Sequence, residues 1–193
     1  EATLGNGRDQ RRLTWDVLLP HIQDEPLPAN KKDYQKLLKK QEGYKLAEVK
    51  GKASSAFASN WENKTIELGK NTFGWKSLKL NFGKKEVTMN VTETNGKSYE
   101  LPFGYQQWMT TTFDAYPPYS ITPIDRFKGL EGPYYASGSY AWISKEELQL
   151  KVHYVNWVSA LEITFRMDEN GEVKLNVQTN YIKKPYSISG KIK

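Results

Sequence analysis

Apolar and polar residues alternate one by one through most of this chain from residue 53 onward, and this alternation limits the possible fold more than any other feature. It is clearest over residues 77–82, 87–92, 148–154, 161–167 and 173–178. Successive side chains of a β-strand point to opposite faces, so a period of two places the apolar residues on one face. The pattern predicts antiparallel strands that pack on one face and are wetted on the other.

Turn residues separate these runs. Asn95-Gly96 and residues 168–171 supply side chains that tolerate positive φ between predicted strands. Weaker strands are predicted over residues 53–60, 64–69, 105–112 and 134–143. About eight to ten short strands with regular turns are typical of a mainly β fold, either an antiparallel barrel or a sandwich of two sheets.

Aromatic residues make up 13% of the chain, with 12 Tyr, 7 Phe and 6 Trp. Most are expected to fill a β-core, because aromatic side chains bury large areas and suit pleated strands. The alternative is that some form a sugar-stacking platform or line an apolar pocket at a barrel mouth. The candidate ligand-binding residues are Trp61, Trp108, Trp157 and Tyr119. Trp157 is the best placed, because it adjoins Asn156 at a predicted hairpin turn.

Residues 113–123, which include Tyr119, carry three prolines among aromatic residues. Proline cannot donate to a sheet ladder, so this stretch is predicted to be an ordered connection and not a strand. We expect the connection to plug or cover one end of the β-structure. A lid over a ligand is the alternative.

The first part of the chain has a period of about 3.6 instead of two. Four apolar residues at i, i+3, i+4 and i+7 form one stripe on a predicted helix: Trp15, Leu18, Leu19 and Ile22. Asn6 or Asp9 can cap the start of this helix. Pro20 is expected to kink or end it.

A linker and a second helix follow. Two prolines within residues 24–30 argue against regular structure there. Asn30 can cap a second short helix that runs through Lys40, and Gly43 is a stop signal after it. The sequence therefore predicts two domains: residues 1–43, a helical lead-in with a proline-rich linker, and residues 44–193, a β-module.

The residue types that catalytic and metal sites usually need are scarce. The chain has no cysteine, which excludes disulfides and thiolate sites, and its histidines are His21 and His153. The sequence contains no Ser-x-x-Lys, Gly-x-Ser-x-Gly, His-Glu-x-x-His or glycine-rich phosphate loop. Tyr154-Val155-Asn156 matches a Tyr-x-Asn element, but on a predicted strand and without partner motifs. We expect no catalytic residue, no metal site and no cofactor on this chain.

The charge balance predicts neither a nucleic-acid partner nor a membrane span. Lys and Arg total 28 against 22 Asp and Glu, a formal net charge of +6, whereas a nucleic-acid binder gathers its basic residues in a patch. Acidic residues interrupt the densest basic stretch, residues 31–52, which favours a solvated helix face. No stretch approaches the roughly 20 apolar residues of a membrane helix.

Several motifs, in this order, resemble a known family. Residues 12–20 (Arg-Leu-Thr-Trp-Asp-Val-Leu-Leu-Pro) and the Pro-Leu-Pro at 26–28 resemble the last helix and the linker of bacterial serine hydrolases related to β-lactamases and penicillin-binding proteins. A β-rich accessory module follows in those proteins. Residues 53–60, 74–82, 101–108 and 141–142 are similar to it.

This resemblance implies a lipocalin-like barrel appended to an exported hydrolase, in the periplasm or at the cell surface of a bacterium. Its partner would be the upstream catalytic domain of the same polypeptide. The family's Ser-x-x-Lys, Tyr-x-Asn and Lys/His-x-Gly elements belong to that upstream domain, and no position of this chain matches them in context. The barrel would then be non-catalytic, with a structural role or a role in substrate access.

Two functions stay open on the sequence. The first is this accessory module, and the alternative is an independent module that binds a carbohydrate or a small apolar ligand on its aromatic residues. In the family the apolar stripe packs on the catalytic domain, so here we expect it to pack against the barrel or a neighbouring molecule. A barrel filled by side chains favours the first function, and a concave site lined by exposed Trp or Tyr favours the second.

Overall fold

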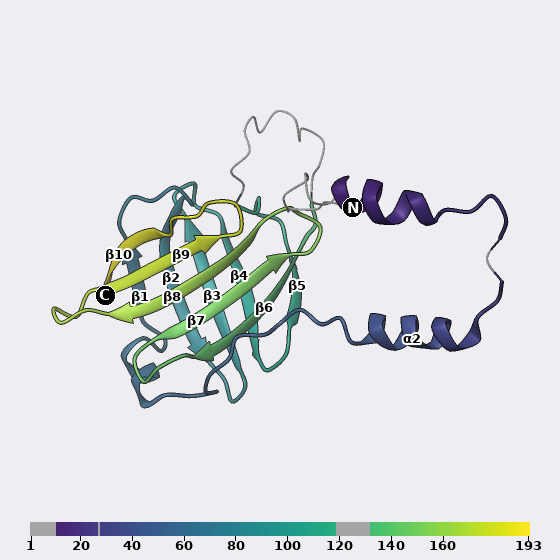
Figure 1. The fold of residues 1–193 in the computed structure, drawn as a ribbon. Helices are drawn as coiled ribbons and strands as arrows, with labels where there is room; N and C mark the ends of the chain where they lie inside the picture. The colour runs from purple at the N-terminus through teal and green to yellow at the C-terminus, as the bar shows by residue number, and fades with distance from the viewer. Residues whose placement is uncertain (1–10, 27, 119–131) are drawn as a thin grey trace. The chain divides into compact units, whose positions relative to one another are not determined.

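Figure 1 shows the computed structural model of the chain, which describes residues 11–26, 28–118 and 132–193. The chain divides into two compact units, Glu1–Ala47 and Glu48–Lys193. Within the described residues, the first contains two short helical segments and the second contains the strands. We call them the helical unit and the barrel unit.

The first helical segment changes its winding as it approaches Pro20. Residues 11–13 are α-helical, Thr14–Leu18 form a π-helical turn (η1) and Leu19–His21 form a 3₁₀ turn (η2). The ring of a proline clashes with the carbonyl four residues earlier. A wider turn relieves this clash, and the N–H of Leu19 donates to the oxygen of Thr14. The segment ends beside Pro20, as predicted, whereas the predicted caps Asn6 and Asp9 lie outside the described residues.

The second helix, α2 (Lys31–Glu42), is capped as predicted. Asn30 Oδ1 accepts a hydrogen bond from the N–H of Asp33 at 3.1 Å, which satisfies a donor of the first turn. At the other end the N–H of Gly43 donates to the oxygen of Lys39 at 3.2 Å. The helix boundaries are therefore set by local residues that the sequence identifies.

The barrel unit begins with a 3₁₀ turn, η3 (Ala56–Asn60), and continues with ten strands among the described residues. They are β1 Thr65–Leu68, β2 Trp75–Phe82, β3 Glu86–Glu93, β4 Ser98–Tyr105, β5 Met109–Phe113, β6 Tyr134–Trp142, β7 Leu148–Tyr154, β8 Ala160–Met167, β9 Val173–Thr179 and β10 Tyr186–Ile192. Every run with clear alternation lies in a strand. The weaker predictions over 64–69 and 134–143 are also confirmed, as β1 and β6.

The strand predicted over residues 53–60 is wrong, because η3 occupies this stretch. Ser55 Oγ accepts a hydrogen bond from the N–H of Phe57 at 3.1 Å and caps the turn. Phe57 and Trp61 then meet edge to face at 5.3 Å. A local side-chain cap and an i, i+4 aromatic pair thus override the weak strand preference.

Two further parts of the strand prediction differ from the structure. The stretch 105–112 is interrupted by a turn at Gln106, whose φ is +54°, so β5 starts at Met109. The strand prediction also omits β4 and β10, although both alternate. Tyr99, Leu101 and Phe103 share one phase of β4, and Tyr186, Ile188 and Ile192 share one phase of β10.

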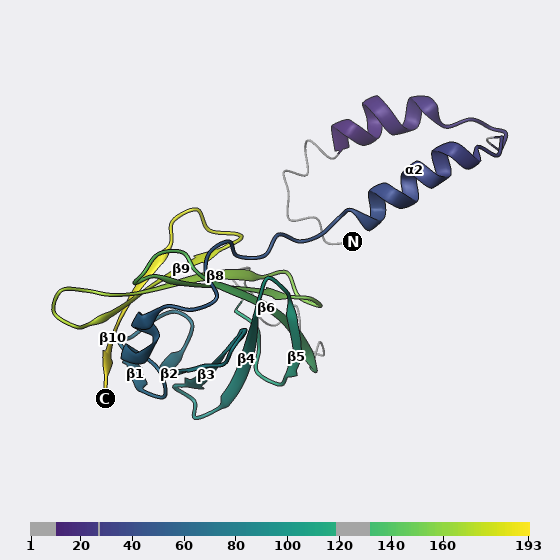
Figure 2. The same ribbon diagram turned by 90° about the horizontal axis from the view of Figure 1, so that it is seen from below.

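The strands form an up-and-down meander that closes on itself (Figure 2). Strands pair antiparallel with their chain neighbours from β1 to β4 and from β5 to β10, and β10 pairs with β1. β4 pairs with β6 in parallel at Gly104↔Ser139 and Tyr105↔Tyr140. Within the described residues this ring contains nine strands, with β5 paired to β6 beside it. In a closed ring with an odd number of strands, neighbouring strands cannot all be antiparallel. One pair, β4 and β6, is therefore parallel.

Apolar side chains from the inner face of the strands fill the barrel. The largest that are fully buried are Trp61, Trp75, Trp142, Tyr140, Phe103, Phe165, Ile66, Leu78, Leu80, Met89, Leu101 and Leu148. They belong to one continuous cluster, as expected for a packed barrel interior. The predicted fold class, mainly β with an antiparallel barrel after two short helices, is therefore confirmed, and ring closure decides between a barrel and a sandwich.

Gly138 lies where β6 passes close to β4. A Cβ at this position would lie 2.3 Å from the oxygen of Pro102 and 2.8 Å from Cδ1 of Phe103. Any side chain here would push β6 away from β4, so the approach of these two strands depends on glycine.

Candidate functional site

The structure does not bring the predicted ligand-binding residues together. Trp61 is 0% exposed and lies in the barrel core, so its surface is not accessible to a ligand. Its ring stacks on Trp142 at 5.5 Å with an interplanar angle of 8°. Trp61 therefore supports the interpretation of the aromatic residues as core, and Tyr119 lies outside the described residues.

Trp108 is half-buried and covers a histidine. Its ring meets His153 of β7 edge to face at 5.2 Å, and His153 Nε2 is buried without a hydrogen-bond partner in the described part of the chain. Burial is the main cause that lowers the pKa of His153, and the charge of Lys151 lowers it further, while Glu162 acts in the opposite direction. The contact thus favours a neutral imidazole on the barrel wall.

Trp157 follows β7 and packs into an aromatic cluster at one end of the barrel. Its ring meets Tyr134 at 5.5 Å and Tyr116 at 6.2 Å, both edge to face. Tyr116 belongs to the described part of the proline-rich connection, and its neighbours Ala115 and Pro117 are buried. This part of the connection covers the barrel end, as predicted.

Beside Tyr116 the same barrel end is hollowed into a cleft of about 380 Å³, which we call the aromatic cleft. Its aromatic lining consists of Phe73, Trp75, Tyr99, Tyr116, Tyr181 and Tyr186. Phe73 stacks on Trp75 at 4.8 Å and meets Tyr186 edge to face at 5.3 Å. Contacts between the rings therefore hold part of the wall of the cleft in place.

Sequence reasoning missed this cleft because its residues lie at strand ends, where the alternation stops. Phe73 lies in the turn just before β2. Trp75 starts β2, Tyr99 lies at the start of β4, Tyr186 starts β10 and Glu93 ends β3. In an up-and-down barrel the starts of even-numbered strands and the ends of odd-numbered strands meet at one rim. Aromatic residues at those ends were the available signal, but using it requires the strand order.

Glu93 is the charged side chain among the described residues that line the aromatic cleft. Its Oε2 accepts a hydrogen bond from Asn95 Nδ2 at 2.8 Å. Opposite, Trp75 Nε1 donates to the Tyr99 hydroxyl at 3.2 Å. Burial raises the pKa of Tyr99, the bond from Trp75 lowers it and the charge of Glu93 raises it, so the phenol stays protonated.

The Tyr-x-Asn element belongs to the barrel wall. Tyr154 is fully buried, which raises the pKa of its phenol well above the ordinary value. Asn156 Oδ1 accepts from the N–H of Tyr135 at 2.9 Å, and its Nδ2 donates to the oxygen of Pro133 at 3.1 Å. Both ends of the Asn156 amide are thus used to hold backbone, and the two side chains do not form an exposed pair.

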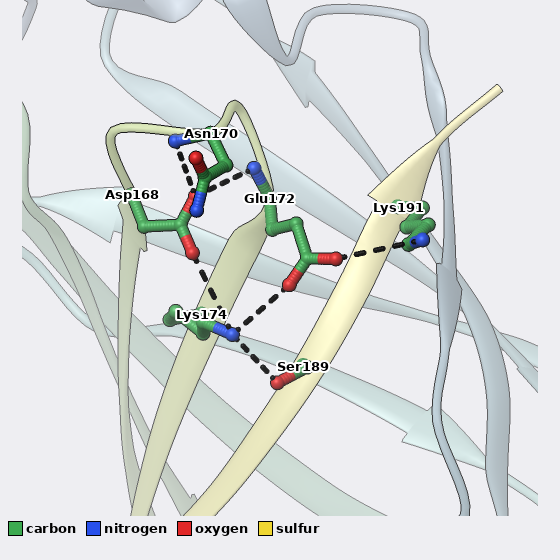
Figure 3. A network of polar contacts seen from close by, with 6 residues as sticks. All are labelled: Asp168, Asn170, Glu172, Lys174, Ser189 and Lys191. Atoms are coloured by element: carbon green, nitrogen blue, oxygen red, sulfur yellow. Dashed lines mark hydrogen bonds and ion pairs between the residues drawn. The ribbon is translucent and has the colours of Figure 1, made fainter.

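A charged network lies at the other end of the barrel, on the β8–β9 hairpin (Figure 3). Lys174 Nζ lies 3.6 Å from Asp168 Oδ2 and 3.1 Å from Glu172 Oε2, and it donates to Ser189 Oγ at 2.9 Å. The backbone N–H of Glu172 is the main cause that lowers the pKa of Asp168, and the bond to Lys174 is the main cause for Glu172. These carboxylates are satisfied by the turn and by Lys174, so the network holds a hairpin closed.

In the helical unit the apolar stripe is exposed. Trp15 and Ile22 are each 67% exposed, Leu18 is 61% exposed and Leu19 is 39% exposed. The described residues of the helical unit therefore do not themselves bury this stripe.

The described ranges hold no group of three His, Asp or Glu side chains that could bind a metal ion. None of the helices in those ranges is long and apolar enough to cross a membrane. No protein-family model matches this chain, and no curated protein matches its sequence.

Proposed function

We propose that this chain is a non-catalytic accessory module, a β-barrel carried by an exported bacterial serine hydrolase related to β-lactamases. The observation that carries the proposal is a contrast: the barrel is filled by its own side chains, whereas the stripe of Trp15, Leu18, Leu19 and Ile22 is exposed. Exposed apolar side chains gathered on one helix face mark a contact surface. Its occupant, in this proposal, is the catalytic domain that precedes the module in the same polypeptide.

The resemblance supports this occupant. Trp15, Leu18 and Leu19 of the stripe lie within the motif that resembles the last helix of the hydrolase domain, residues 12–20, and in those proteins that helix packs on the catalytic domain. The segment following the helical unit is tied firmly to the barrel, since Lys52 and Trp142 exchange two backbone hydrogen bonds of 2.9 Å.

The coding sequence upstream of Glu1 tests the proposal directly. We expect a Ser-x-x-Lys domain in the same reading frame. We also expect the longer protein to hydrolyse a chromogenic ester or β-lactam, and the 193-residue chain to leave both substrates unchanged. A signal peptide immediately before Glu1, or hydrolysis by the 193-residue chain, contradicts the proposal.

Footprinting of Trp15 tests the contact surface. Hydroxyl radicals are expected to oxidise Trp15 several-fold more slowly in the longer protein than in the 193-residue chain, because the upstream domain covers the ring. Tyr135, which is exposed on the barrel, serves as the control and keeps its rate. Equal oxidation of Trp15 in both proteins would show that the stripe is not the contact.

A further inference from the structure

The aromatic cleft has a chemical character that an accessory role does not require. Its wall combines the rings of Phe73, Trp75, Tyr99, Tyr116 and Tyr186 with the carboxylate of Glu93. The face of an aromatic ring carries partial negative charge, so rings and carboxylate act in the same direction on a ligand.

The cleft is a hollow and not a flat platform. Sugar stacking needs a flat ring face open to solvent, but Trp75 is 1% exposed and Phe73 is stacked on it at 4.8 Å. Tyr116, which is 50% exposed, comes from the proline-rich connection, whereas Trp75, Tyr99 and Tyr186 come from strands. The rings therefore border a hollow of about 380 Å³, which suits a compact ligand better than a flat one.

The negative charge of Glu93 favours a positively charged ligand in the cleft. No lysine or arginine in the described part of the chain forms an ion pair with Glu93. Asn95 Nδ2 donates a hydrogen bond to Glu93 Oε2 at 2.8 Å. This neutral donor orients the carboxylate and leaves the negative charge of Glu93 uncompensated. A cation entering the cleft would meet this charge together with the ring faces.

We propose that the aromatic cleft binds a small quaternary ammonium cation of the choline type, free in solution and not part of a lipid, with Glu93 as its counter-ion. Aromatic rings attract a cation within about 6 Å of their centres, and quaternary ammonium groups are the ligands that such cages recognise. Methyl groups on the nitrogen also reduce the cost of leaving water and provide apolar contact with Tyr116 and Phe73. The proposal concerns the barrel unit alone and does not depend on the accessory role.

The first experiment is a titration of the full chain with choline, followed by calorimetry and by tryptophan fluorescence, since Trp75 lines the cleft. We expect saturable binding. The neutral isostere 3,3-dimethylbutan-1-ol is expected to bind at least about tenfold more weakly, because it keeps the shape and loses the charge. Methyl glucoside is expected not to bind, and phosphatidylcholine vesicles are expected not to sediment the chain.

Variants test the residues. Glu93→Gln is expected to weaken choline binding by about tenfold, and Tyr116→Ala by about fivefold, through loss of the counter-ion and of one ring. Glu100→Gln, on the outer face of β4, is the matched control and keeps wild-type affinity. Unchanged urea unfolding curves establish that each variant folds.

Five results overturn the proposal. Four are no saturation by choline, equal binding of the neutral isostere, binding of methyl glucoside in place of choline, and unchanged affinity in Glu93→Gln. The fifth is sedimentation with vesicles in the absence of free choline binding, because it would assign the surface to a membrane.

Discussion

The helical unit and the barrel unit use apolar residues in opposite ways. Every described residue from 11 to 47 is exposed except Leu38, which is half-buried, whereas the barrel buries a continuous cluster of side chains below 6% exposure. The helices rely on local hydrogen bonds such as the Asn30 cap, and helices of about a dozen residues are marginal in water without packing. The barrel joins strands from distant parts of the chain. The comparison teaches that packing between distant strands stabilises the barrel, while the helical unit depends on local contacts.

Replacing the same residue type in each unit gives the largest expected difference. Trp61→Ala removes a fully buried ring and is expected to lower the free energy of unfolding by about 3–5 kcal/mol. Trp15→Ala removes an exposed ring and is expected to change it by less than about 0.5 kcal/mol. Urea unfolding followed by far-ultraviolet circular dichroism measures both. Equal losses in the two variants would contradict the division between the units.

A pair of glycines tests the closure of the ring. Gly138→Ala is expected to lower the free energy of unfolding by about 1–3 kcal/mol, because the new Cβ overlaps the oxygen of Pro102. Gly43→Ala in the helical unit is the control: φ is −75° and the nearest atom to its Cβ is 3.4 Å away, so little change is expected. If Gly138→Ala is as mild as Gly43→Ala in the same urea experiment, the approach of β6 to β4 does not need glycine.

The smallest expected effect is a pH dependence confined to the barrel. The pKa of His153 is lowered in the folded state, chiefly by burial, so the unfolded chain binds the proton more readily. The contribution of His153 to the free energy of unfolding is complete above the pKa of about 6.5 that it has in the unfolded chain. This contribution is lost as the pH falls towards the lower pKa of the folded state. The urea midpoint is therefore expected to decrease between about pH 7.5 and pH 5.5, and less so in His153→Gln.

His21→Gln is the matched control for this measurement, since His21 lies in the helical unit, which does not hold the barrel together. It is expected to keep the wild-type dependence on pH. If the pH dependence of the urea midpoint disappears in His21→Gln and persists in His153→Gln, His153 is not its source and the prediction is contradicted.

Local patterns predicted the parts of the fold that depend on local chemistry. The alternation of Val173, Leu175 and Val177 identified β9, because a strand exposes its two faces with a period of two. Asn30 identified the start of α2, because a cap acts within one turn. The prediction failed over residues 53–60, where the Ser55 cap and the packing of Trp61 outweigh a weak strand preference.

The candidate site was predicted less well, for a physical reason. Trp61 and Trp157 look alike in the sequence, but one fills the core and the other borders the barrel end. Exposure depends on which rim a strand end reaches. Tyr116, Glu93 and Tyr186 come together only through the pairing order of several strands.

The sequence by itself determined that this chain has a helical lead-in followed by amphipathic strands. The periods of about 3.6 and two that identify them are patterns of residues close together in the sequence. The tertiary structure alone decided that the strands close as a ring, with a parallel junction between β4 and β6 and with Gly138 where a Cβ would overlap the oxygen of Pro102. It also decided that aromatic side chains from distant strand ends enclose a cleft with one carboxylate. Register and closure are non-local properties, and no run of neighbouring residues contains them.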